Sequence, residues 1–239
     1  MVEIKEKKKL GVIGGVGPAA SSFYYKGVTE HTLARCDQDH LDIVMYSHAT
    51  LPDRTAAIES GDDAELIRLL QEDVQMLEKL GVANIAIPCN TSHYFYDQMQ
   101  AATSVPIIHM VRESVVYAVQ HYHQVNKIGI MGTDGTIGTG IYDRECERMG
   151  VRAVHPSPQM QKLVMRIIYD EIKSGKKGTP ALFYEVYDEF KANGCDVIIL
   201  ACTELSVFKQ YHGVPEDCLD AMDVLIRESI VRSNAQYVS

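Results

Sequence analysis

The chain has 239 residues, a length typical of one large domain or of two compact halves. Hydrophobic residues make up 46% of it and charged residues 23%, a globular composition that excludes a disordered, collagen-like or coiled-coil chain. The formal net charge of −9 argues against a nucleic acid or an anionic membrane as partner, because both require a basic protein surface.

The cysteines and the N-terminus indicate the cellular compartment. The 6 cysteines are too few and too scattered for a disulfide scaffold, and they form no Cys-x-x-Cys pair. The basic stretch 5–9 and the apolar stretch 10–16 resemble a signal peptide, but glycines interrupt the apolar part and Pro18 follows it. No apolar run reaches the roughly 18 residues of a membrane-spanning helix. We therefore expect a cytoplasmic protein with reduced thiols and no metal site.

Apolar strands and helices alternate along the chain. We expect strands at 9–14, 41–46, 83–88 and 105–109, and helices at 20–36 and 63–80. The second helix is amphipathic, because its apolar residues recur every three to four positions. Strands that are continuous apolar runs between helices are typical of a parallel sheet covered on both faces.

The pattern then starts again, which indicates a duplication. Residues 9–15 resemble residues 127–133, an offset of 118, and residues 81–91 resemble residues 194–204, with Cys89 and Cys202 113 positions apart. The sequence therefore predicts an α/β fold of two homologous doubly wound domains with parallel sheets, related by a pseudo-twofold axis. We expect the first domain to comprise residues 1–113 plus 219–239 and the second residues 114–218, with the active site in the cleft between them.

Each half places a cysteine at the same point. Cys89 and Cys202 each end an apolar strand shortly before a threonine, which is expected to cap the following helix. Ligands of open α/β sheets bind beyond the carboxyl ends of the strands, and a helix N-terminus favours the thiolate. Two such thiols across a cleft suit a redox pair, a metal site or two-base proton transfer at a carbon. We favour proton transfer, because a disulfide needs touching sulfurs and a metal needs further ligands.

Two other functions compete with this hypothesis. The segment Gly15-x-Gly17-x-x-Ala20 fits a relaxed dinucleotide fingerprint, but the second strand ends at Tyr46 without the acid that binds a ribose. A two-lobed amino-acid-binding protein would use the same cleft with inert cysteines.

Four motifs carry a family resemblance. The segments Cys89-Asn90-Thr91, Cys202-Thr203-Glu204, Gly14-Gly-Val-Gly-Pro18 and Leu51-Pro-Asp-Arg-Thr55 resemble the aspartate/glutamate racemase family from Leu10 to about Ile230. The resemblance implies a racemase that works without pyridoxal phosphate or another cofactor. Glutamate racemases differ at Gly14-Gly15 and at Glu204, so the aspartate racemase branch fits better. Hydantoin racemase and maleate isomerase share the fold and remain alternatives.

The resemblance also implies roles for particular residues. Cys89 and Cys202 would be the two acid/base thiols, and Arg54 would hold a substrate carboxylate. Lys173 would contact the second carboxylate of a small acidic amino acid, aspartate ahead of glutamate. The remaining residues would orient the amino and carboxylate groups (Asn90, Thr91 and Thr203) or contact the ammonium or Cys202 (Glu204). We expect a homodimer.

Overall fold

The computed structural model describes residues 6–239, and it contains two parallel sheets. Lys5, where the signal-like stretch begins, lies outside the described residues. The first sheet has the order β2-β1-β3, and the second has the order β5-β4-β6-β7. The strands are β1 (Leu10–Gly14), β2 (Ile43–Ser47), β3 (Asn84–Ala86), β4 (Lys127–Gly132), β5 (Arg152–Val154), β6 (Val197–Ala201) and β7 (Cys218–Asp220). The predicted α/β class with two parallel sheets is confirmed.

Helices connect the strands in both halves. The α-helices of the first half are α1 (Pro18–His31), α2 (Arg54–Ser60), α3 (Ala64–Lys79), α4 (Tyr96–Ala101) and α5 (Met110–His121). Those that follow are α6 (Asp134–Gly138), α7 (Ile141–Arg148), α8 (Pro158–Met165), α9 (Pro180–Ala192), α10 (Thr203–His212) and α11 (Ala221–Arg232). Three further segments are the 3-10 helices η1 (Asp37–Asp39) and η2 (Thr91–Phe95) and the π-helix η3 (Arg166–Ile172). No helix among residues 6–239 is long and apolar enough to cross a membrane.

Two predicted elements differ from the structure. The segment 105–109 is not a strand: only Ile107 forms a bridge, with Ile85, because Pro106 has no N–H and the Val105 N–H is bound by Thr103. The first helix begins at Pro18 and ends at His31, whereas we expected residues 20–36. Proline is favoured at the first helical position, since its missing N–H is not needed there.

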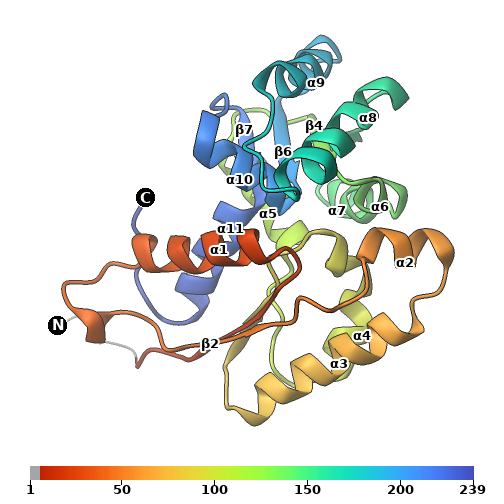
Figure 1. The fold of residues 1–239 in the computed structure, drawn as a ribbon. Helices are drawn as coiled ribbons and strands as arrows, with labels where there is room; N and C mark the ends of the chain where they lie inside the picture. Colours follow the sequence, from red (N-terminus) through yellow and green to blue (C-terminus); the bar gives the residue numbers. More distant parts are fainter. Residues whose placement is uncertain (1–5) are drawn as a thin grey trace.

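The core lies between the two sheets as well as on their outer faces. One apolar cluster joins strand residues of both sheets, such as Val12 and Ile199, to helices α1, α5 and α11. Two other clusters cover the outer face of each sheet, under α3 and under α8 and α9. Figure 1 shows α1 and α11 crossing between the lower, N-terminal half and the upper half. The hydroxyl of Tyr24 on α1 donates to Ser229 on α11 at 2.6 Å, within this shared core.

The domain boundaries stay a prediction. Helix α11 packs against α1 and α5, so the C-terminal residues lie against helices of the first half as well.

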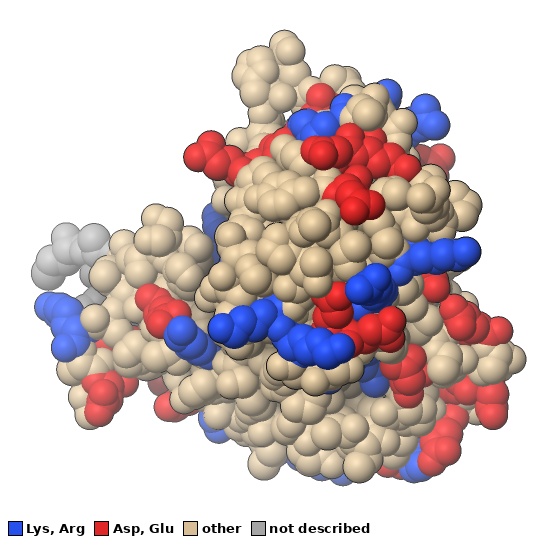
Figure 2. All heavy atoms as spheres, turned by 45° about the horizontal axis from the view of Figure 1, so that its top comes forward, with Lys and Arg blue, Asp and Glu red and all other residues tan. Residues whose placement is uncertain are grey.

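On the face shown in Figure 2, acidic and basic side chains are interspersed.

Candidate active site

The candidate site lies where the strands of both sheets end. Cys89 follows β3 after two residues, and Cys202 follows β6 directly. Both thiols are buried, with 8% and 7% of the residue exposed. They line one small cavity together with residues from both halves. The duplicated cysteines therefore face the same small space.

All eight residues singled out from the sequence line this cavity. They are Arg54, Cys89, Asn90, Thr91, Lys173, Cys202, Thr203 and Glu204. Five further residues complete the lining, namely Val16, Asp53, Thr55, Thr133 and Tyr169.

The helix caps differ from expectation. The N-cap of η2 is Asn90 and that of α10 is Cys202, and neither makes a side-chain cap hydrogen bond. Cys202 begins a helix of ten residues, whereas Cys89 precedes a short 3-10 helix. The dipole of α10 therefore acts at Cys202, and Cys89 has no equally long helix behind it.

Cys202 is held by a carboxylate. Its thiol donates to Glu204 Oε2, with 3.0 Å between Sγ and the oxygen. Burial and the negative charge of Glu204 raise the pKa of Cys202 well above its ordinary value. Cys202 is accordingly a thiol at neutral pH.

Cys89 lies beside a cation instead. Burial alone would lower the pKa of Arg54, but its interactions with Cys89 and Asp53 outweigh burial, so the pKa is raised. Arg54 donates from one terminal nitrogen to the Pro52 carbonyl at 3.0 Å. Its Nε is buried and has no hydrogen-bond partner among residues 6–239. The guanidinium thus retains an unused donor next to the cavity.

Asn90 supplies a second unused donor. The hydroxyl of Tyr142 donates to Asn90 Oδ1 at 2.6 Å, which fixes the orientation of the amide. The Asn90 Nδ2 is buried and finds no partner within the described chain. A buried donor without a partner costs free energy, so a ligand acceptor at this point would be favoured.

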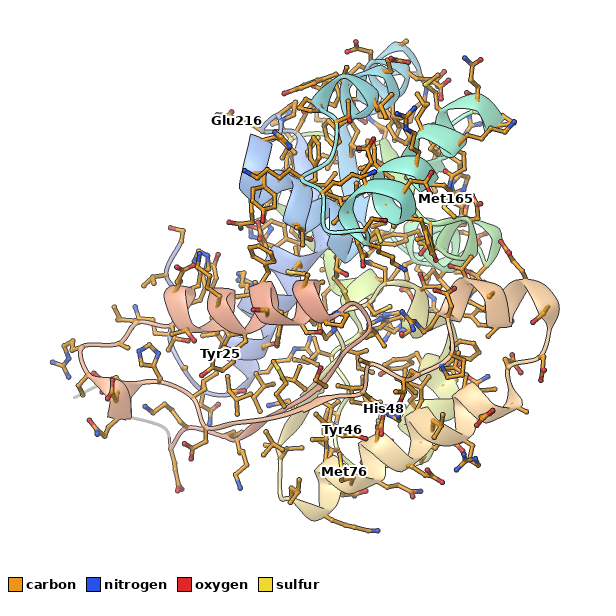
Figure 3. All side chains as sticks on the ribbon, viewed as in Figure 1. Tyr25, Tyr46, His48, Met76, Met165 and Glu216 are labelled. Carbon is orange, nitrogen blue, oxygen red and sulfur yellow. The ribbon has the colours of Figure 1, made fainter. Side chains whose placement is uncertain are left out.

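Lys173 reaches the site from a π-helix. Segment η3 continues from Met165, the last residue of α8, which Figure 3 labels at the edge of the upper half. The Lys173 Nζ lies 3.9 Å from the centre of the Tyr169 ring and 3.8 Å from Asp53 Oδ2. Burial lowers the pKa of Lys173, but the negative charges of Glu204 and other groups outweigh burial. The pKa is therefore raised above its ordinary value, and the side chain stays charged. π-Helical turns are frequent at functional sites.

Four threonine hydroxyls join the two halves beside the cavity. Thr91 lies 3.1 Å from Thr133 and 2.9 Å from Thr136, and Thr55 lies 3.4 Å from Thr133. A Cβ added to Gly135 would lie 2.8 Å from the Thr55 hydroxyl, so only glycine allows this close approach. We call these four residues the threonine cluster.

The sequence analysis missed the cluster and the Asp53–Tyr169 contact. Thr133 has a sequence signal, because it occupies the position that the repeat assigns to Gly15. Tyr169 has no sequence signal, because it lies 116 residues from Asp53 along the chain and on a π-helix. Its hydroxyl donates to Asp53 Oδ2 at 3.4 Å. Among the described residues, no group of three or more His, Cys, Asp or Glu side chains is arranged to hold a metal ion.

Two parallel α/β sheets with paired thiols at their strand ends define a protein suited to acid–base chemistry on a small ligand. Comparison with known proteins agrees with this class. A sequence model of the Asp/Glu/hydantoin racemase family matches residues 13–229. The chain therefore belongs to this family of racemases, and racemases are isomerases.

Individual relatives resemble the chain over most of its length. The broad-specificity amino-acid racemase RacX of Bacillus subtilis is 30% identical over 225 residues, covering 92% of this chain and 96% of RacX. A glutamate racemase of Persephonella marina is 29% identical over 160 residues, 65% of this chain and 60% of its own. The aspartate racemase of Picrophilus torridus has the same fold, with a TM-score of 0.83 at 24% identity, covering 97% of this chain and 96% of that chain.

Proposed function

We propose that the protein inverts the Cα configuration of an amino acid by two-base proton transfer between Cys89 and Cys202. The observation that carries this proposal is the placement of two buried thiols around one small cavity, in opposite electrostatic surroundings. Cys202 is a thiol bound to Glu204, and Cys89 lies beside the Arg54 cation. One sulfur thus lies beside an anion and the other beside a cation.

The proposed reaction has two steps. The Cys89 thiolate takes the Cα proton of one enantiomer, so the C–H bond breaks, an S–H bond forms and the electron pair delocalises into the carboxylate. The Cys202 thiol then delivers its proton to the opposite face, and its S–H electrons remain on sulfur. The reverse reaction starts from the Cys202 thiolate with Cys89 protonated.

The unused donors supply the necessary stabilisation. We infer that Arg54 Nε and Asn90 Nδ2 bind the α-carboxylate as it gains negative charge. Donors that are already in place where charge develops stabilise a transition state, and more so in a buried cavity. Thr91, Thr203 and the other polar groups of the cavity would orient the amino group.

The proposed substrate is an acidic amino acid, with aspartate preferred over glutamate. The Gly14-Gly15 pair and Glu204 support this preference, because they depart from the glutamate racemase pattern. Lys173 would turn toward the side-chain carboxylate. The likeness to a racemase of broad specificity supports racemisation but leaves the side chain open.

Proton NMR in deuterated water tests the proposal. We expect the Cα proton signal of L- and D-aspartate to disappear without added pyridoxal phosphate, as deuterium replaces the proton. Absence of exchange for every acidic amino acid, combined with saturable binding, would support a two-lobed binding protein instead.

A further inference from the structure

A buried histidine lies directly behind Cys89. His93 belongs to η2, and only 3% of the residue is exposed. Its Nδ1 lies 2.8 Å from the Cys89 carbonyl oxygen, and its Nε2 lies 3.1 Å from the backbone nitrogen of Met110, the first residue of α5. The ring therefore connects the backbone beside the thiol to the start of a core helix.

These two contacts fix the position of the ring proton. The Met110 N–H can only donate, so Nε2 is the acceptor and the proton is on Nδ1, which donates to the Cys89 carbonyl. The Ile108 carbonyl lies 3.3 Å from Nε2, farther than the Met110 nitrogen, and it cannot accept in place of Nε2 without leaving the ring. Burial lowers the pKa of His93, so the ring carries a single proton at neutral pH.

The second half holds its cysteine differently. His93 and Ser206 each lie four residues after a cavity cysteine, but the Ser206 hydroxyl donates to a carboxylate on β7 at 2.7 Å. The Cys202 carbonyl instead accepts the Leu205 N–H at 2.9 Å, at the start of the ten-residue helix α10. Cys89 is followed by a short 3-10 helix, and there a side chain binds the carbonyl.

The hydrogen bond at the Cys89 carbonyl orients two residues of the site. The peptide group between Cys89 and Asn90 is planar, so a fixed carbonyl also fixes the backbone of Asn90. The side chain of Asn90 is held separately, by the Tyr142 hydroxyl at 2.6 Å. The Cys89 thiol and the unused donor of Asn90 therefore depend on the same peptide plane.

We propose that His93 is a positioning residue that holds Cys89 and Asn90 in place for proton transfer, through the hydrogen bond from its Nδ1 to the Cys89 carbonyl. This inference rests on the proposed racemase function. His93 does not line the cavity of the thiols, so it acts through the backbone and does not touch the substrate. A misplacement of about 1 Å at a reacting group is enough to cost about 10²-fold in rate.

Two amide variants separate the two contacts of His93. The asparagine amide lies about as far from Cβ as Nδ1 does, so His93→Asn keeps a donor for the Cys89 carbonyl and loses the acceptor for Met110. The glutamine amide reaches about as far as Nε2, so His93→Gln keeps the acceptor for Met110 and loses the donor. Each variant leaves one buried backbone group without its partner, so urea unfolding should show a similar loss of stability.

Racemisation of aspartate by the two variants tests the positioning role. We expect His93→Gln to lower kcat by about 10- to 100-fold with little change in KM, and His93→Asn to keep most of kcat. A merely structural role predicts the same kcat for both variants, because both lose one buried hydrogen bond.

His121 provides a matched control. It is exposed at the end of α5, and its Nδ1 lies 3.1 Å from the carbonyl of Tyr117, four residues earlier, as in the pair of His93 and Cys89. We expect His121→Gln to leave kcat and KM unchanged.

Nitrogen-15 NMR of the histidine rings tests the same hydrogen bond without a substitution, and so decides even if the variants do not fold. We expect His93, assigned through its contact with the Met110 amide, to carry its proton on Nδ1 and none on Nε2 between about pH 6 and pH 9. A proton on Nε2 overturns the positioning role.

The outcomes separate this inference from the proposed function. If the unaltered protein racemises aspartate and His93→Gln loses no more kcat than His93→Asn, the positioning role is overturned and the racemase function stands. If the unaltered protein exchanges no Cα proton, the racemase function is overturned, together with the role that depends on it.

Discussion

The Cys202 thiol donates a hydrogen bond to the carboxylate of Glu204, two residues further along the chain, across 3.0 Å. This contact makes the two cysteines unequal, because Cys89 lies beside Arg54 instead. A pseudo-symmetric fold thus carries an asymmetric pair of thiols. Both directions require one thiol and one thiolate, so Cys202, whose pKa is raised, is expected to set the alkaline limit of the pH profile for both enantiomers.

Replacing Glu204 by Gln is expected to shift that profile. Burial and the Glu204 charge raise the pKa of Cys202, so the thiolate fraction at neutral pH is small and grows about tenfold with each pH unit. Glu204→Gln removes the negative charge, lowers the pKa of Cys202 and moves the alkaline fall in rate, which marks the loss of the second thiol proton, to lower pH. Single-turnover Cα proton exchange from each enantiomer between about pH 6 and pH 10 measures the shift.

The exposed residue Glu185 provides the control for this prediction. Glu185→Gln should leave both pH profiles unchanged. An alkaline limb of the Glu204→Gln profile at the same pH as in the unaltered protein would contradict the effect of Glu204 on Cys202.

Arg54→Lys is expected to lower kcat/KM about 100-fold, although it keeps the positive charge. Lysine lacks the planar fork and the Nε donor that is buried without a partner in this structure. Steady-state racemisation monitored by chiral chromatography measures the effect. The surface variant Arg68→Lys, on α3, is the control. If Arg54→Lys were about as active as the unaltered protein, Arg54 would not bind the substrate carboxylate through its planar fork.

Gly135→Ala is expected to destabilise the protein by about 1–3 kcal/mol, because its Cβ would force the threonine cluster apart. Gly138 lies on the same helix α6 with nothing near an added Cβ, so Gly138→Ala should be neutral or slightly stabilising. Urea unfolding of both variants tests this difference. Equal free energies of unfolding for Gly135→Ala and Gly138→Ala would show that the close contact between Gly135 on α6 and Thr55 on α2 is not needed for stability.

The buried carboxyl group of Asp220 is expected to make the stability of the protein depend on pH. Burial and the nearby Asp223 raise its pKa from 3.8 to about 6 in the folded protein. The folded state therefore favours the protonated form, and this contribution to stability is present below about pH 4 and is lost as the pH rises through 6. Asp220→Asn cannot titrate, so its stability relative to the unaltered protein should increase between pH 4 and pH 7, by about 1–3 kcal/mol.

Urea unfolding at several pH values measures this difference. Asparagine can still accept the Met222 N–H at the start of α11, so the helix cap is kept. A stability difference that does not change with pH would contradict the raised pKa.

The sequence predicts those parts of the site that depend on local pattern. Apolar strands ending in Cys89 and Cys202 can be identified because the duplication repeats them. The contact between Asp53 and Tyr169 depends on how the halves pack and on a π-helix, neither of which has a sequence pattern. The segment 105–109 forms only one bridge, at Ile107, where its apolar content predicts a strand. Apolar content alone does not show that N–H pairing is missing around Pro106.

Racemisation by variants that each lack one cysteine tests the central claim most directly. Cys89→Ala and Cys202→Ala are each compared with Cys36→Ala, which changes an exposed thiol outside the cavity. Chiral chromatography of both enantiomers should show that either cavity variant loses interconversion by about 10²–10⁴-fold, because each removes one of two required acid/base groups, while Cys36→Ala keeps it. Full two-way racemisation by Cys89→Ala would contradict two-base transfer.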